Sequence, residues 1–188
     1  AADQQNAQRH WMSLKAESGA VAFVGMDGLT VGADTVRVEI NRGYTETDGS
    51  LSVIDYQSQA LEVQTGTGTT LTMDMDGTQG ELLRASGNLH LNVFSFFSVE
   101  GSFAFSKTTE TLKVLETKGT VDVGDDETKD VAVDLLTLGA ANVNAFAGMN
   151  GGTADALGLS LTGVDFALAL AAEKTPAAGA TKRSWATL

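Results

Sequence analysis

Apolar and polar residues alternate along most of this chain, and this period of two is the feature that most limits its fold. The clearest stretch runs from Leu89 to Phe105, where apolar residues share one parity and polar residues hold the other, apart from an interruption at 94–96. Successive side chains of a β-strand point to opposite faces of a sheet, so the pattern predicts strands. One strand of that span would be about 56 Å long, far beyond the usual length. The pattern therefore predicts either an elongated sheet or a tight turn at Glu100-Gly101.

Similar alternation predicts strands at Val21–Val24, Thr35–Ile40, Leu51–Asp55, Ala60–Val63, Thr69–Met75, Glu110–Leu115, Thr120–Val123, Val131–Leu138, Asn142–Ala147 and Leu159–Leu170. The dipeptides Asp27-Gly28, Asp48-Gly49 and Asp76-Gly77 favour the positive φ of hairpin turns. We therefore predict an all-β fold, an elongated antiparallel β-meander folded into a roll or sandwich. A β-solenoid is the alternative, although the unequal spacing of the four pattern starts, at Leu29, Leu82, Leu136 and Leu159, disfavours uniform rungs.

Two internal echoes indicate a repeat. The segment Ala22–Gly28 returns as Ala145–Gly151 with five identities in seven positions, and both tryptophans lie in an Arg-x-Trp-x-x-Leu motif, at Arg9–Leu14 and Arg183–Leu188. The two motifs are 174 residues apart. Because a fixed period is typical of repeat architectures, we interpret residues 1–173 as one all-β repeat domain, and residues 174–188 as a linker and the start of the next repeat.

Composition excludes several classes of function. Twelve Lys and Arg residues against 24 Asp and Glu give a net charge of −12, which disfavours nucleic acid as a partner. The chain has no cysteine, so a disulfide framework, a zinc-thiolate site and a cysteine nucleophile are excluded. Apolar stretches are interrupted well before the roughly 18 residues of a membrane span, so we expect no membrane insertion.

The densest carboxylate cluster is the candidate for calcium, against the alternative of a solvated loop. Calcium prefers carboxylate oxygens, and the cluster contains Asp122, Asp125, Asp126, Glu127 and Asp130. An EF-hand at Asp74–Gly77 is excluded because the twelfth position of the loop is Leu83 instead of glutamate. We expect no other cofactor.

Neither histidine has the sequence neighbours of a catalytic or metal-binding residue. His10 stands in the tryptophan motif, whose second copy has Ser184 there, and His90 lies on the polar parity of a predicted strand, where we expect it to be exposed. We therefore predict that the chain is not an enzyme.

The Arg-x-Trp-x-x-Leu motif, Ala22–Gly28 with its echo at Ala145–Gly151, and Leu157–Phe166 together resemble the long tandem repeats of giant bacterial surface or secreted proteins of the adhesin-like kind. The resemblance covers nearly the whole chain. It implies an extracellular or cell-surface location, end-to-end stacking on neighbouring repeats of the same chain, and a role as spacer or adhesive stalk.

On this interpretation Trp11 and Trp185 pack at or near the junction between consecutive copies. A module that binds glycans or surface polymers through a polar sheet face is the alternative function.

Overall fold

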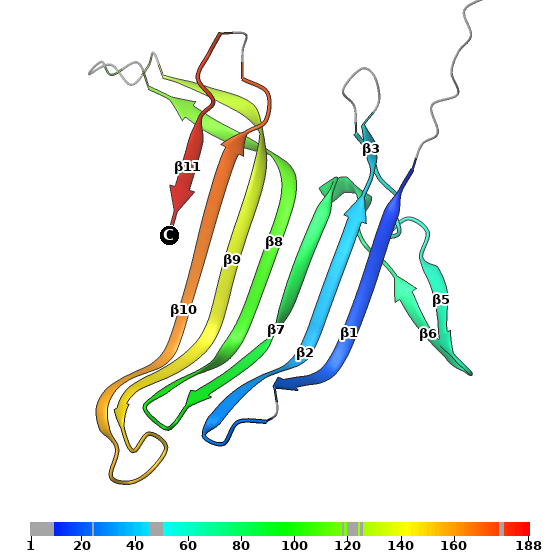
Figure 1. The fold of residues 1–188 in the computed structure, drawn as a ribbon. Helices are drawn as coiled ribbons and strands as arrows, with labels where there is room; N and C mark the ends of the chain where they lie inside the picture. The colour runs from blue at the N-terminus through cyan, green and yellow to red at the C-terminus, as the bar shows by residue number, and fades with distance from the viewer. Residues whose placement is uncertain are drawn as a thin grey trace, which may run out of the picture.

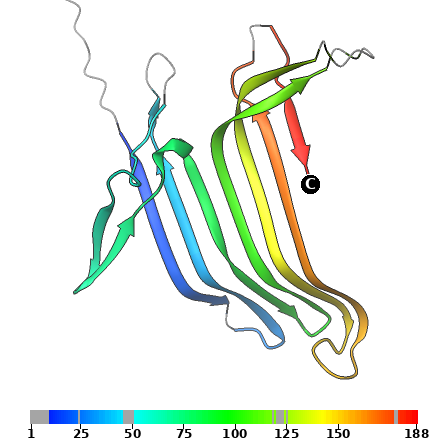
Figure 2. The ribbon, with the colours of Figure 1, turned by 180° about the vertical axis from the view of Figure 1, so that it is seen from behind.

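The computed structural model describes residues 10–23, 25–45, 51–117, 119, 124, 126–176 and 179–188 of the chain. Long strands lie side by side in one antiparallel sheet of seven, which curves along its length as an open layer (Figure 1; Figure 2). In spatial order the strands are β1 (Met12–Phe23), β2 (Leu29–Arg42), β7 (Leu82–Val93), β8 (Phe97–Glu116), β9 (Glu127–Met149), β10 (Leu157–Glu173) and β11 (Ser184–Thr187). Every pairing in the sheet is antiparallel. The predicted all-β meander is therefore confirmed, and a solenoid is not formed.

The segment between β2 and β7 forms an insertion beside β1 (Figure 1). It contains two small sheets, β3 (Tyr44–Thr45) with β4 (Leu51–Ser52) and β5 (Leu61–Gly66) with β6 (Thr69–Met73), and a 3₁₀ turn, η1 (Gly77–Gln79). Its apolar residues join Leu82 of β7 in a buried cluster of Tyr56, Met73, Met75 and Leu82. This cluster, which we call the insertion core, ties the insertion to the main sheet.

The turn after β7 lies at 94–96, not at Glu100-Gly101, where one of the two predictions placed it. Glu100-Gly101 instead lies inside β8. Phe94 and Ser95 have φ of 50° and 58°, and the Phe96 amide donates to the Val93 carbonyl at 2.9 Å. Such a turn usually carries Asn or Gly, and neither residue occurs at 94–96 to mark it.

The predicted turn at Asp27-Gly28 does join β1 to β2, with Gly28 at φ 80°. Asp76-Gly77 instead begins η1, where the Asp76 carboxylate accepts from the Thr78 amide. The predicted turn at Asp48-Gly49 and the predicted strand Thr120–Val123 lie outside the described residues.

One face of the main sheet is apolar from edge to edge. Toward the ends of the strands near Trp11 it carries a row that crosses the sheet from Ala16 to Leu168. Toward the opposite ends it carries a row from Val31 to Leu161. We call this surface the apolar face, and the other surface the opposite face.

The apolar face is continuous only because several strands change parity along their length. The register shifts in β2 between Asp34 and Arg37, between β8 and β9 near Gly101, and in β10 between Leu161 and Val164. Left-handed residues accompany these shifts: Thr35, Asn142 and Gly163 have φ of 52°, 53° and 61°. A β-bulge adds one residue to a strand and so moves the following side chains to the other face. The bulges thus keep the apolar residues of each strand on a single face.

The main sheet is one layer, so few apolar side chains are fully buried. Among the described residues they are Tyr56, Met73, Met75, Leu82, Val131, Val133, Ala140 and Ala171. Most belong to two small clusters at the strand ends near the tryptophans. Many large residues of the apolar face, including Leu159 and Phe23, remain exposed.

Candidate repeat junction

The strand β11 carries the second tryptophan motif, and it pairs with β10 at the edge of the sheet opposite β1 (Figure 1). The register places Ala171 opposite Trp185 and Leu170 opposite Ala186. The segment that repeats the start of β1 in sequence therefore forms a strand on the last long strand of the meander.

An apolar cluster holds β11 in place. Trp185 packs on buried Val131, Val133 and Ala171, with Leu112, Val114 and Leu135 at the margin. We call this cluster the junction core. It forms because the ends of β8 and β9 curve across the ends of β10 and β11 (Figure 1; Figure 2).

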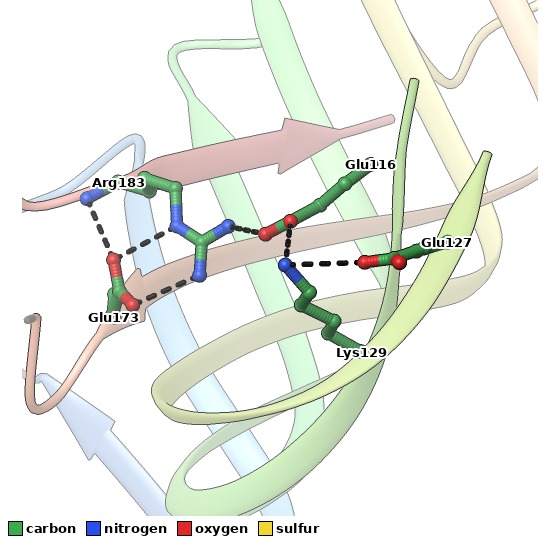
Figure 3. A network of polar contacts seen from close by, with 5 residues as sticks. All are labelled: Glu116, Glu127, Lys129, Glu173 and Arg183. Atoms are coloured by element: carbon green, nitrogen blue, oxygen red, sulfur yellow. Dashed lines mark hydrogen bonds and ion pairs between the residues drawn. The ribbon is translucent and has the colours of Figure 1, made fainter. Parts of the chain in front are cut away.

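A charged network lies beside the junction core (Figure 3). Arg183 donates from Nε and Nη2 to the two carboxylate oxygens of Glu173, each at 2.9 Å, and from Nη1 to Glu116 at 2.6 Å. Lys129 donates to the other Glu116 oxygen at 2.6 Å and lies 3.5 Å from Glu127. The guanidinium also lies 5.5 Å from the Trp185 ring centroid. Bidentate charge-assisted pairs of this kind fix geometry as well as adding energy.

The network lowers the pKa of both central carboxyls. Lys129 and then Arg183 hold the pKa of Glu116 below its ordinary value, and Arg183 does the same for Glu173. A carboxylate with a lowered folded-state pKa stabilises the fold above its ordinary pKa, and this stabilisation is lost as pH falls toward the folded pKa.

We expect Arg183→Met to lower the melting temperature at neutral pH, and we expect the difference from wild type to shrink between about pH 6 and about pH 3. Calorimetry over that range measures it. Lys113→Met removes an exposed pair with Asp130 and should change the melting temperature little at any pH. A difference that stays constant for Arg183→Met would contradict the role assigned to the two carboxylates.

The first tryptophan lies at the other edge of the sheet, just before β1. Trp11 donates from Nε1 to the Ser52 carbonyl of the insertion at 3.0 Å. The two residues predicted at a junction, Trp11 and Trp185, are therefore at opposite edges of the same sheet. Register places the Trp185 side chain on the opposite face, and the hydrogen bond to Ser52 places the Trp11 ring beside the insertion, which packs on Leu82 of that same face.

Sequence reasoning found the tryptophans and missed the charged network. Glu116, Lys129 and Glu173 come from three different strands, and no spacing in the sequence brings them together. Arg183 was the one member of the network that the sequence marked as part of the junction, because it belongs to the tryptophan motif.

The structure describes only part of the predicted calcium cluster. Asp122 and Asp125 lie outside the described residues. Glu127 contacts Lys129, and Asp130 accepts a hydrogen bond from Lys113 at 2.9 Å. Within the described ranges no three metal-binding side chains converge, so calcium binding stays an untested prediction.

The opposite face carries a hollow away from the junction, and His90 both lines this hollow and belongs to a polar cluster beside it. His90 Nε2 lies 2.8 Å from Asp34, and Asn88 donates to the other Asp34 oxygen at 2.7 Å. These contacts, that of Asn88 first, lower the pKa of Asp34 to about 2. The neighbouring hydroxyl of Ser102 donates to Asn88. His90 is thus partly exposed, as predicted, with Asp34 as its partner.

Comparisons of the chain with protein-family models, with curated proteins and with solved structures give no match. Among the described residues, no helix has the length and apolar character needed to cross a membrane.

Proposed function

We propose that this chain is a non-enzymatic structural repeat, which serves as a spacer or adhesive stalk in a large extracellular or cell-surface protein. One observation carries the proposal. The second copy of the tryptophan motif is folded as a strand on the last long strand of the first copy, with its own apolar core and charged network.

The geometry gives such a spacer a definite repeat length. One period contributes six strands to the main sheet, β1, β2, β7, β8, β9 and β10. Neighbouring strands lie about 4.8 Å apart, so each copy would add about 29 Å across the strands. This increment is short for a period of 174 residues, because the strands run across the axis along which copies add. The array would therefore be a broad ribbon.

Chains of one, two and four copies at the 174-residue period test the proposal. We expect the melting temperature to rise from one copy to two, because the second copy supports the edge of the first. We also expect small-angle scattering to show the length growing by about 29 Å per copy. Equal melting temperatures with independently tumbling copies would overturn it.

A glycan-binding module is a second candidate, favoured by the hollow on the opposite face. The hollow has a volume of about 420 Å³, and its lining combines apolar residues such as Phe146 with hydroxyl, amide and imidazole groups, including Asn92, Asn144 and His90. Such groups can hydrogen-bond sugar hydroxyls. Binding on a glycan array that is abolished by Asn144→Ala would support this candidate. The absence of binding to any glycan at high protein concentration would count against this candidate.

A further inference from the structure

We propose that β1 of one copy pairs along the free edge of β10 of the preceding copy, with Met12–Phe23 against Leu159–Leu170, so that one antiparallel sheet runs through consecutive copies. The inference deepens the proposed function and rests on it. It names the partner as a second copy of this chain and fixes the register of the contact.

The register follows from the strand pairs already present. Ala186 and Thr187 occupy the positions of Met12 and Ser13 in the repeated motif, and they lie opposite Leu170 and Ala169. Continuing the same antiparallel register places Leu14 opposite Leu168. It also places Val21 opposite Leu161 and Phe23 opposite Leu159. Apolar residues of the two strands therefore meet at these positions of the apolar face.

The change of parity occurs at the same height in both strands. In β10 the apolar face carries Leu161 before the bulge and Phe166 and Leu168 after it. In β1 it carries Leu14 and Ala16 on one side of Gly19 and Val21 on the other. The proposed register sets Gly19 opposite Gly163, the left-handed residue of the β10 bulge. A slip of one residue would put the apolar residues of one strand on the wrong face.

One pair of like charges works against this register. Glu17 would lie opposite Asp165, which alone would be unfavourable. Glu17 is already neutralised by Arg37 at 2.8 Å and by Lys15 at 3.9 Å. Lys15 is held by Asp74 at 2.7 Å and by the Thr72 carbonyl at 2.9 Å, so Arg37 is the main cation that offsets Glu17.

Both edges are open in the described chain. β1 pairs only with β2, and β10 pairs only with β9 from Leu157 to Leu168. Val21 and Phe23 on one edge are 54% and 55% exposed, and Leu159 and Leu161 on the other are 67% and 51% exposed. Long apolar edge strands template pairing with another chain, and here the two edges match each other.

The two tryptophans have complementary contacts. Trp185 has the junction core, and Trp11 has the hydrogen bond to Ser52 of its own insertion. Between two copies a single tryptophan would have both contacts, because both lie on the opposite face.

The test extends the chain after Leu188 with a second copy of Lys15–Phe23, the segment that follows the motif in β1. The control extension has the same nine residues, reordered so that Val21 and Phe23 fall on the other parity. Hydrogen exchange by mass spectrometry follows the edge amides of Leu159–Leu168. We expect exchange there to slow by about tenfold or more in the extended chain, with a higher melting temperature, and neither change in the control.

Equal protection by both extensions, or protection by neither, would overturn the edge pairing. The two-copy chain separates this failure from failure of the spacer proposal. If two copies stabilise each other while Leu159–Leu168 still exchanges as in one copy, the spacer proposal stands and the edge pairing is wrong.

Discussion

Val133→Asp is expected to lower the free energy of unfolding by about 4 kcal/mol or more, the largest effect we expect from one substitution. Val133 is 0% exposed at the centre of the junction core. Its neighbours across the sheet are Glu110 on β8 and Glu173 on β10, so the new carboxylate would be buried between two acidic residues, and the nearby Arg183 is already paired with Glu173 and Glu116. The change in the free energy of unfolding is measured by guanidinium unfolding in a Trp11→Phe background, with Trp185 fluorescence as the signal.

Two controls separate burial from charge. Leu115→Asp adds the same charge on β8 at a residue that is 59% exposed, and should stay within about 0.5 kcal/mol of wild type. Val133→Ala removes apolar contacts without adding charge and should cost about 1.5–3 kcal/mol. A Val133→Asp protein as stable as Val133→Ala would show that the junction core is open to water.

Leu82→Ala is expected to lower the free energy of unfolding by about 2–5 kcal/mol. Leu82 is 2% exposed and is the residue of the main sheet in the insertion core. Truncation leaves a cavity beneath Tyr56, Met73 and Met75, so the insertion loses its apolar attachment. Chemical unfolding measures the loss, and hydrogen exchange in β5 and β6 should rise before the main sheet unfolds.

The matched control is Leu159→Ala, which removes the same atoms from a leucine that is 67% exposed. We expect a change within about 0.5 kcal/mol in the single-copy chain. If the two substitutions cost the same, the insertion core does not hold the insertion, and the ion pair of Lys15 with Asp74 at 2.7 Å would be its main attachment.

The strands and their antiparallel order could be predicted because each depends on local alternation. The shared parity of Leu89 and Phe105 survives in the structure, since β7 and β8 keep one register throughout. The turn between them could not be predicted, because Phe94 and Ser95 are poor residues for positive φ. The bulges were also hidden: Thr35 is of a residue type that rarely adopts positive φ, and Asn142, although Asn tolerates it, lies at the start of an alternating stretch that reads as an ordinary strand.

The candidate site was predictable only where it repeats in sequence. Trp11 and Trp185 were found through their shared motif, and the structure places them at the two edges of the sheet. The contacts of Arg183 with Glu116 and Glu173 depend on how β8, β10 and β11 converge. Contacts of this kind between distant strands cannot be predicted from a single sequence.

The direction of the hydrogen bonds has a mechanical consequence for an array of these copies. Bonds between antiparallel strands run perpendicular to the strands, and therefore along the axis on which copies would add. A pulling force on the two ends would load these bonds one strand at a time, so they would part in sequence, as in a zipper. One released copy would extend from about 29 Å to about 600 Å. Such a stalk would give way stepwise under tension and absorb load before the protein detached.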